Sequence, residues 1–320
     1  MENSSESLKI AFDECHDNSI EIETSAYGGF IEYFFQQNLK IGKITEKISW
    51  DKLKNFNLLI IGNPNNEYSI KEIYTILEFL KSGGNLLIFS DEGADISNQT
   101  NLNELAGHLG FKILPNIIYD PGSNAGKEVH PIIQKFDTHP IAAEISSIVL
   151  ASGCSFELLK KDEFLEFMDV SVKPIAFCSA TAKMKIYQDR QWNELSAKES
   201  NVIITGRYFD GRFVCLGTPS ILSSLSSVYG LESRDNFNLI KNILRWLLDE
   251  RESTDLTATL FGDQVEVLVK IKKELWNWTR SIASVGEWGD FSKIVNYSLK
   301  LLRKTILDKQ QNSGQKKIKN

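Results

Sequence analysis

Four short apolar runs, each ending in polar residues, dominate the first part of the chain. They are IAFDECHDN (10–18), LLIIGNPNN (58–66), LLIFSDEG (86–93) and IIYDPGS (117–123). Such nearly continuous apolar runs are typical of strands that are buried on both faces of a parallel sheet. The carboxyl ends of parallel strands share one edge, so we expect the polar residues that follow them to converge on a single crevice.

Segments with helical spacing separate these runs. Apolar residues recur every three or four positions over 24–38, and Ser69 with Glu72 forms a capping box before a second helix. Asn101 is the expected N-cap of a short helix that ends at Gly110. With a weak strand near 41–46, this alternation predicts a mostly parallel sheet with helices on both faces.

Beyond residue 120 the pattern changes to closely spaced strands. Expected strands cover 145–151, 174–178, 183–187, 201–207 and 212–216, with a hairpin signal at Asp210-Gly211. A helix over 235–250 completes an α/β domain that spans residues 1–250.

A polar break at 251–256 separates this domain from two further segments. Amphipathic stretches at about 262–283 and 290–308 predict a C-terminal helical hairpin over 251–308, and the polar residues 309–320 predict a disordered tail.

Composition excludes several classes of protein. The net charge of −6 and the pI near 5.4 argue against a nucleic-acid partner, which requires clustered basic residues. The four cysteines are widely spaced, and no apolar run is long enough to span a membrane. The N-terminus MENSSESLK lacks the basic start and apolar middle of a signal peptide. We therefore expect a soluble cytoplasmic protein.

The candidate binding crevice consists of polar residues at the strand ends. Carboxylates and an imidazole suit a hard metal, a general base or recognition of sugar hydroxyls. In an extended strand Asp13 and Glu14 would face opposite sides, so a shared ligand requires a turn. Under the alternative interpretation, Asp13 and Asn18 cap the following turn and His16 is simply packed. The candidates are Asp13, Glu14, His16, Asn18, Asn63, Asn65, Asp91, Glu92 and Asp120.

No motif indicates a cofactor or a catalytic nucleophile. The turn at 62–66 lacks the Lys and Ser/Thr of a P-loop, and no G-x-G-x-x-G follows the first strand. Asp91 occupies the place of a nucleophile elbow, which requires a Ser or Cys with a histidine base. The cysteines have no activating neighbours in sequence, so we expect inert thiols and no cofactor.

Several segments resemble a known family. FDECHDN, LLIIGNPNNEYSIKEI, FLKSGGNLLIFSDEG, NLNELAGHLGFKI and VIITGRYFDGRFVCLGTPSIL with NFNLIKNILRWLL are similar to the GIFT domain. Gliding-motility transporter-associated (GldG-like) proteins and an intraflagellar transport subunit share this domain. The resemblance covers about residues 8–250 and implies the flavodoxin-like fold of the class I glutamine amidotransferase superfamily.

The same resemblance implies that the amidotransferase machinery is missing. The catalytic Cys of that superfamily would fall near Asp91, and its late His-Pro-Glu would fall near Gly217, Thr218 and Pro219. Neither catalytic residue type stands at these positions, which argues against glutamine hydrolysis through a thiolate.

Two hypotheses of different classes follow. The first is a non-catalytic binding or scaffolding protein, with a carbohydrate ligand or a protein partner, and with association or self-association through the C-terminal helices. The second is a hydrolase or metal-dependent enzyme that uses Asp13, Glu14, His16, Asp91 and Glu92. Carboxylates that meet in an open cleft favour the second hypothesis, whereas carboxylates bound to backbone amides indicate caps.

Overall fold

The computed structural model describes residues 8–160, 169–248, 259–261 and 264–266. By its internal contacts the chain divides into two compact units, residues 1–249 and residues 250–320.

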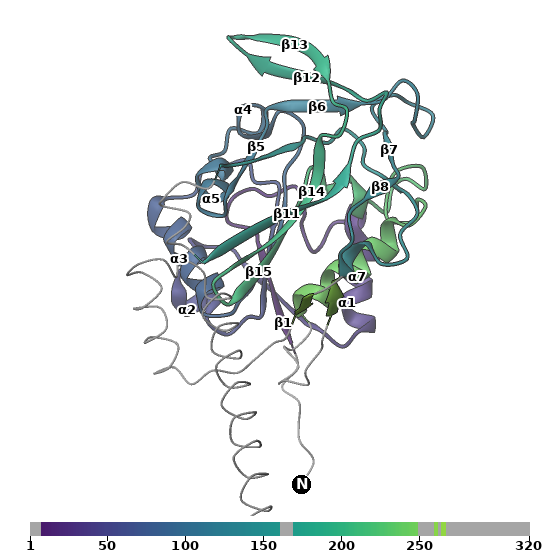
Figure 1. Cartoon of the computed structure of the whole chain (residues 1–320). Helices are drawn as coiled ribbons and strands as arrows, with labels where there is room; N and C mark the ends of the chain where they lie inside the picture. The colour runs from purple at the N-terminus through teal and green to yellow at the C-terminus, as the bar shows by residue number, and fades with distance from the viewer. Residues whose placement is uncertain (1–7, 161–168, 249–258, 262–263, 267–320) are drawn as a thin grey trace, which may run out of the picture. The chain divides into compact units, whose positions relative to one another are not determined.

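A ten-stranded sheet forms the centre of the first unit (Figure 1). Five adjacent strands are parallel, because each is paired in parallel register with its neighbour. In sheet order they are β2 (Lys40–Ile44), β1 (Lys9–Asp13), β3 (Leu58–Gly62), β4 (Asn85–Phe89) and β15 (Gly211–Leu216).

The remaining strands of this sheet are antiparallel, so the prediction of a mostly parallel sheet is wrong for this half and the sheet is mixed. β15 pairs with β14 after a connection of only two residues, Phe209 and Asp210, whereas a parallel crossover needs a dozen or more. The antiparallel strands are β14 (Asn201–Tyr208), β10 (Phe156–Leu158), β5 (Phe111–Ile113), β11 (Val170–Phe177) and β8 (Lys135–Phe136).

Alternate residues of the central strands belong to two separate cores. In β1, Ile10 and Phe12 pack on one side and Ala11 on the other, and β3, β4 and β15 repeat this alternation. Because side chains in a strand alternate between faces, both faces of these strands are apolar and require cover.

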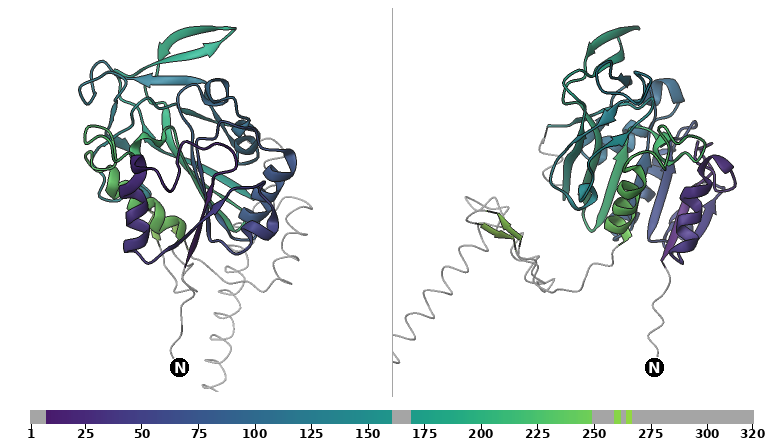
Figure 2. Two further views of the ribbon diagram at one scale, coloured as in Figure 1. Left: turned by 180° about the vertical axis from the view of Figure 1, so that it is seen from behind. Right: turned by 90° about the vertical axis from the view of Figure 1, so that its right-hand side faces the viewer.

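Helices supply this cover on both faces, as predicted (Figure 1). α1 and α7 pack side by side on the first core, where the Tyr33 and Phe237 rings lie 5.4 Å apart (Figure 2). α3 and α5 pack on the second core. The helices are α1 (Gly28–Gln36), α2 (Trp50–Leu53), α3 (Ile70–Lys81), α4 (Ala94–Asn98), α5 (Leu102–His108) and α7 (Asn236–Leu248), with 3₁₀ turns η1 (Ser25–Tyr27), η2 (Pro140–Ala142) and η3 (Pro219–Leu222).

Helix capping matches the sequence at α3 and departs from it at α5. The capping box of Ser69 and Glu72 is present. Asn101 makes no capping bond with its side chain, which instead bonds the backbone of Tyr68. The Asp95 carboxylate accepts the first N–H groups of α5 in its place. Asn101 is the N-cap residue of α5, as predicted, but the Asp95 carboxylate six residues earlier supplies the side-chain capping bonds.

A three-stranded sheet lies beyond one end of the central sheet (Figure 1). It consists of β6 (Asn116–Tyr119), β12 (Lys183–Gln188) and β13 (Gln191–Ser196), and the sequence analysis missed β13. The expected strand over 145–151 is reduced to β9 (Ile148–Val149), which pairs with β7 (Ile132–Ile133).

Within the second unit the structure describes one antiparallel pair, β16 (Thr259–Phe261) with β17 (Gln264–Glu266). The predicted helix from about 262 is thus wrong for residues 264–266, where Thr259, Phe261 and Val265 favour a β pair. The rest of the predicted hairpin, and the tail over 309–320, lie outside the described residues. Among the helices that are described, none combines the length and the hydropathy that a membrane crossing demands.

Candidate functional site

The loop that follows β1 fills the crevice predicted from the sequence. β1 lies between β2 and β3, so the chain turns to opposite sides of β1 at this point, and open α/β folds bind ligands at such switch points. Here Asn18 Oδ1 accepts the Gly62 N–H at 2.7 Å, and the Ile20 N–H donates to the Gly62 carbonyl at 3.3 Å. Ile20 is only 1% exposed, and a Cβ at Gly62 would lie 2.6 Å from its Cβ. The chain itself occupies the switch point.

A buried histidine fastens the start of this loop to α3. His16 Nδ1 lies 2.9 and 3.0 Å from the two Asp13 oxygens, and its Nε2 lies 3.3 Å from Glu72 Oε1. The Tyr68 hydroxyl donates to Asp13 Oδ2, and its ring stacks on the imidazole at 3.9 Å. We call these four residues, Asp13, His16, Tyr68 and Glu72, the His16 clasp.

Backbone N–H groups also donate hydrogen bonds to the two carboxylates of the clasp. Asp13 accepts the Cys15 N–H at 3.0 Å, and Glu72 accepts the Ile48 N–H at 2.9 Å. Burial by itself would raise the pKa of Glu72. Hydrogen bonds from Ser69 and Ile48, together with the nearby His16, outweigh burial, and the net result is a lowered pKa. The clasp therefore joins β1, α3 and the segment before α2.

The other candidates near β1 and β3 also hold loops in place. Glu14 accepts the Ile22 N–H and pairs with Lys43 at 3.2 Å. The Asn63 amide donates to Ser19 and to Asn98, and the Asn65 amide donates to the Asp17 carbonyl. The structure thus brings Asp13 and His16 together, with the chain turning after Asp13 as a shared site would require.

Asp120 lies apart from these residues and organises a different loop. Its carboxylate accepts the N–H groups of Gly122 and Ser123 at 2.9 Å and the hydroxyls of Ser179 and Thr181. Burial by itself would raise the pKa of Asp120. These four hydrogen bonds outweigh burial, and the net result is a lowered pKa.

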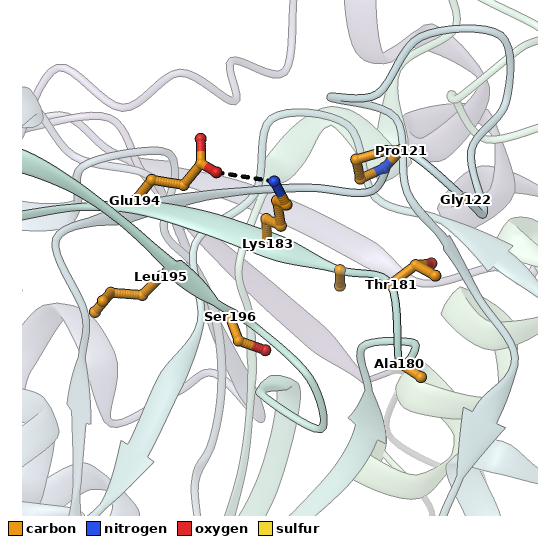
Figure 3. Close-up of a pocket in the computed structure, with 9 residues that line it drawn as sticks. Pro121, Gly122, Ala180, Thr181, Lys183, Glu194, Leu195 and Ser196 are labelled. Carbon is orange, nitrogen blue, oxygen red and sulfur yellow. Dashed lines mark hydrogen bonds and ion pairs between the residues drawn. The ribbon is translucent and has the colours of Figure 1, made fainter.

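An open cleft of about 690 Å³ adjoins the Asp120 loop (Figure 3). The hairpin of β12 and β13 forms one side, where Lys183 and Glu194 pair at 2.9 Å. A volume of this size falls within the range of small-molecule sites. The charged groups of Lys183 and Glu194 already pair with each other, however, and neither is left to bind a charged ligand. The lining residues are Pro121, Gly122, Ala180, Thr181, Ala182, Lys183, Glu194, Leu195 and Ser196.

Asp91 differs from every other candidate carboxylate. It follows β4, is half-buried, and its Oδ1 is buried without a hydrogen-bond partner. Burial raises its pKa to about 7, against the opposing effects of the Glu92 backbone N–H and the Thr218 hydroxyl. Glu92 itself is exposed. Strongly raised pKa values are concentrated at functional sites, so Asp91 is the strongest candidate.

The Asp91 charge influences an aromatic residue of another element. Burial and then the Asp91 and Tyr229 charges raise the pKa of Tyr27, which belongs to η1. The Tyr229 ring lies 4.8 Å from the ring of His130, whose Nδ1 is also buried without a partner. We call Asp91 and the two residues that interact with it electrostatically, Tyr27 and Thr218, the Asp91 cluster.

The thiols show no sign of activation. Burial raises the pKa of Cys154 and of Cys178 to about 12, and raises that of Cys215 as well. Burial, Asp13 and Glu72 raise the pKa of Cys15, and both nitrogens of the neighbouring His16 face carboxylates. In the part of the chain that the structure describes, no three His, Cys, Asp or Glu side chains are arranged to hold a metal ion.

Sequence reasoning missed four residues of these two groups. Glu72 was identified as half of a capping box, and its second partner, His16, is 56 positions away. Tyr68 precedes the cap without any motif of its own. Tyr27 lies within the expected helical segment 24–38, and Thr218 stands where the resemblance places a missing catalytic residue.

The His16 clasp predicts a large stability loss for His16→Ala. Removing the imidazole leaves buried oxygens of the Asp13 and Glu72 carboxylates without their shared partner, which costs roughly 1–3 kcal/mol of unfolding free energy for each carboxylate. Urea unfolding monitored by circular dichroism measures this cost. Lys54→Ala, which removes only an exposed pair with Asp51, is the control and should have little effect. A His16→Ala variant as stable as the control would show that the clasp does not hold the loop.

We expect Asp91→Asn to stabilise the folded protein at alkaline pH. Its folded pKa, about 7, exceeds the ordinary value of 3.8, so its contribution to stability is full at acid pH and is lost as pH rises through 7. Asp91→Asn removes this loss, and at about 1.4 kcal/mol per pKa unit the variant should gain roughly 2–4 kcal/mol over wild type at pH 8 and little near pH 4.

The measurement is chemical unfolding of both proteins across this pH range. Exposed Glu92→Gln is the matched control and should follow wild type. An Asp91→Asn variant that follows wild type at every pH would mean that the Asp91 carboxyl is not perturbed.

Comparison with known proteins relates this fold to a family of transport components. A family model described as ABC-type uncharacterized transport system matches residues 21–201, more than half of the chain. The intraflagellar transport protein 52 homologs of Mus musculus and Homo sapiens are 28% identical over 78 residues and 26% identical over 115 residues. These alignments cover 24% and 36% of this chain, and only 18% and 24% of the relatives' own length.

The solved mmIFT52 N-terminal domain has a similar structure. It matches 74% of this chain and 96% of its own length, with a TM-score of 0.61 and 16% sequence identity. At this identity the likeness establishes a shared fold. The resemblance to the GIFT domain is thereby confirmed, and by the match over residues 21–201 the chain belongs to the ABC-type uncharacterized transport system family.

Proposed function

We propose that this chain is a non-catalytic binding or scaffolding protein of a transport-type assembly. The observation that carries the proposal concerns the carboxylates at the polar edge of the sheet. Asp13, Glu14 and Asp120 each accept backbone N–H groups of their own loops. Carboxylates committed in this way fix loop shape and leave few acceptors for chemistry on a substrate.

The raised thiol pKa values support the same proposal. A cysteine nucleophile acts as the thiolate and needs a lowered pKa, whereas burial raises the pKa of Cys154, Cys178 and Cys215. We further propose that the first unit is a GIFT-like domain on a flavodoxin-like, class I amidotransferase-like fold whose nucleophile position carries Asp91.

Asp91 is also the residue on which the alternative, a hydrolase, depends. A carboxyl with a pKa of about 7 could serve as a general acid or base. We expect purified protein to show no hydrolysis of glutamine, p-nitrophenyl esters or p-nitrophenyl glycosides above a buffer blank. Turnover that disappears in Asp91→Ala and persists in Glu92→Gln would overturn the non-catalytic proposal.

The partner surface is the second part of the proposal. The segments at 262–283 and 290–308, which lie outside the described residues except for strand residues 264–266, are proposed to mediate binding of a protein partner or self-association. The intraflagellar transport names of the relatives support an assembly role, and a carbohydrate ligand of the first unit is a further candidate.

Deletion of residues 254–320 tests this surface. We expect the truncated protein to keep the cooperative unfolding of the first unit and to lose the self-association or partner capture of the full chain. Light scattering and pull-down with the full chain as reference measure both properties. If the truncated protein retains the full chain's association, the surface lies in the first unit and the C-terminal part of the proposal fails.

A further inference from the structure

One edge of the three-stranded sheet carries backbone groups that no other described residue bonds. The strands lie in the order β13, β12, β6, so β6 and β13 are the edge strands (Figure 1). The outer edge of β6 is covered, because the Ile118 N–H donates to the Gly153 carbonyl at 2.8 Å. The Asn116 carbonyl on the same edge accepts the Gly93 N–H at 3.0 Å. From the described chain, no such bond reaches the outer edge of β13.

Three residues of β13 direct their backbone groups toward this open edge. Ala197, just after the strand, donates its N–H to the Ala182 carbonyl at 2.9 Å, and the same register continues to Gln188 opposite Gln191. Hydrogen-bonded and non-hydrogen-bonded residues alternate along an antiparallel pair, so every second residue counted back from Ala197 faces β12. The N–H and C=O groups of the residues between them point outward. These residues are Trp192, Glu194 and Ser196.

β13 also lacks the usual protection of an edge strand. Proteins commonly blunt an exposed edge with a proline, a bulge or a lysine. The strand QWNELS contains neither proline nor lysine, and its register with β12 is regular from end to end. Its single charge, on Glu194, is paired with Lys183 at 2.9 Å. The open backbone groups are therefore accessible to another strand.

We propose that β13 binds an extended segment of a partner protein as an added antiparallel strand. This inference rests on the proposed binding function and names the kind of segment that is bound. In strand addition the backbone hydrogen bonds supply affinity, and side chains at alternate positions supply specificity. Antiparallel pairing continues the two existing pairs of this sheet, β13 with β12 and β12 with β6.

The side chains at the edge favour an uncharged segment with apolar residues on one face. Trp192 is 50% exposed, and its ring lies 5.5 Å from the Tyr187 ring across the hairpin. A residue added opposite Trp192 lies on the same face of the sheet, where aromatic and β-branched side chains stabilise each other. Because Lys183 already pairs with Glu194, a charge on the added strand gains little there.

The cleft beside the Asp120 loop adjoins the same strand. Three of its lining residues, Glu194, Leu195 and Ser196, belong to β13 (Figure 3). An added strand that pairs with Ser196 therefore ends beside a cavity of about 690 Å³. A cavity at this place can hold one of its side chains, and such pockets give strand addition its specificity.

A second copy of this chain fits the edge less well than a different protein. Two-fold antiparallel pairing of β13 with itself has two registers that align outward-facing residues. The register centred on Glu194 places two Glu194 carboxylates directly opposite each other, and opposed like charges are destabilising. The register centred on Asn193 pairs Trp192 with Glu194 and leaves Ser196 unpaired. A segment of another protein can pair with all three outward residues without repulsion.

A short uncharged peptide tests strand addition on the full chain. The probe is carboxyfluorescein-labelled Thr-Val-Thr-Thr-Thr-Val-Thr-amide, and fluorescence polarisation measures its binding. When the valines lie on the side of Trp192, the N–H groups of the second, fourth and sixth peptide residues face β13. We expect N-methylation of these three nitrogens to abolish binding. Methylation of the third, fifth and seventh nitrogens, which face away, is the matched control and should preserve binding.

A proline substitution tests the same bonds from the side of the protein. Glu194→Pro removes one outward N–H and leaves the ladder with β12 intact, because Glu194 does not donate to β12. Glu194→Gln is the control, since it removes the charge and keeps the N–H. We expect the probe to bind Glu194→Pro roughly fivefold more weakly or worse, as the loss of one hydrogen bond implies, and Glu194→Gln like wild type.

Hydrogen exchange of the wild-type protein provides a measurement that needs no variant. Saturating probe should slow exchange of the outward N–H groups of Trp192, Glu194 and Ser196. Exchange at Asn193 and Leu195, whose N–H groups already face β12, should change little.

Three results overturn the inference: the probe does not bind, it binds unchanged after methylation of the second, fourth and sixth nitrogens, or it leaves exchange of the outward N–H groups unchanged. Self-association that is lost in Glu194→Pro would make a second copy the occupant and would overturn it as well. Each of these results leaves the binding or scaffolding role standing. Turnover of a substrate, in contrast, overturns that role whether or not the probe binds.

Discussion

Burial of the central strands on both faces is the constraint from which the rest of this structure follows. β1, β3, β4 and β15 place alternate side chains in two cores, so helices must cover both faces. Backbone and polar side chains can then reach solvent only at the strand ends. The carboxyl edge consequently carries the polar residues, and its loops must satisfy their own backbone groups there.

The polar edge meets this requirement mainly with carboxylates. Asp13, Glu14, Glu72 and Asp120 accept N–H groups from the loops around them, and His16 joins two of these carboxylates across β1 and α3. This arrangement gives the acidic residues of the edge a structural role, because they satisfy backbone groups of the loops around them. Ile20 completes the arrangement by packing on Gly62, where other α/β folds leave room for a ligand.

Elements whose signals lie within a few residues can be predicted from the sequence. Prediction fails where a residue distant in the sequence determines the hydrogen bonding or the strand direction. The capping box of Ser69 and Glu72 is readable because both residues lie within one turn of helix. At α5 the position of the N-cap, Asn101, is readable from the sequence. The source of the capping bonds is not, because the Asn101 side chain bonds Tyr68 and the Asp95 carboxylate accepts the first N–H groups. Strand direction escaped prediction for a similar reason, since an apolar run such as 201–207 has the same pattern in either direction.

The candidate site shows the same division between residue type and environment. Asp13, Asp91 and Asp120 are alike in sequence, each following an apolar run, and composition cannot rank them. Their surroundings in the fold separate them: Asp120 has four hydrogen-bond donors, whereas Asp91 has a buried oxygen with none. A carboxyl that loses stability on ionising is costly to keep near neutral pH, and Asn at the same position would avoid that cost. The same residue type therefore has opposite pKa shifts at two strand ends, raised at Asp91 by burial and lowered at Asp120 by its hydrogen bonds, and only the fold around each carboxyl decides which.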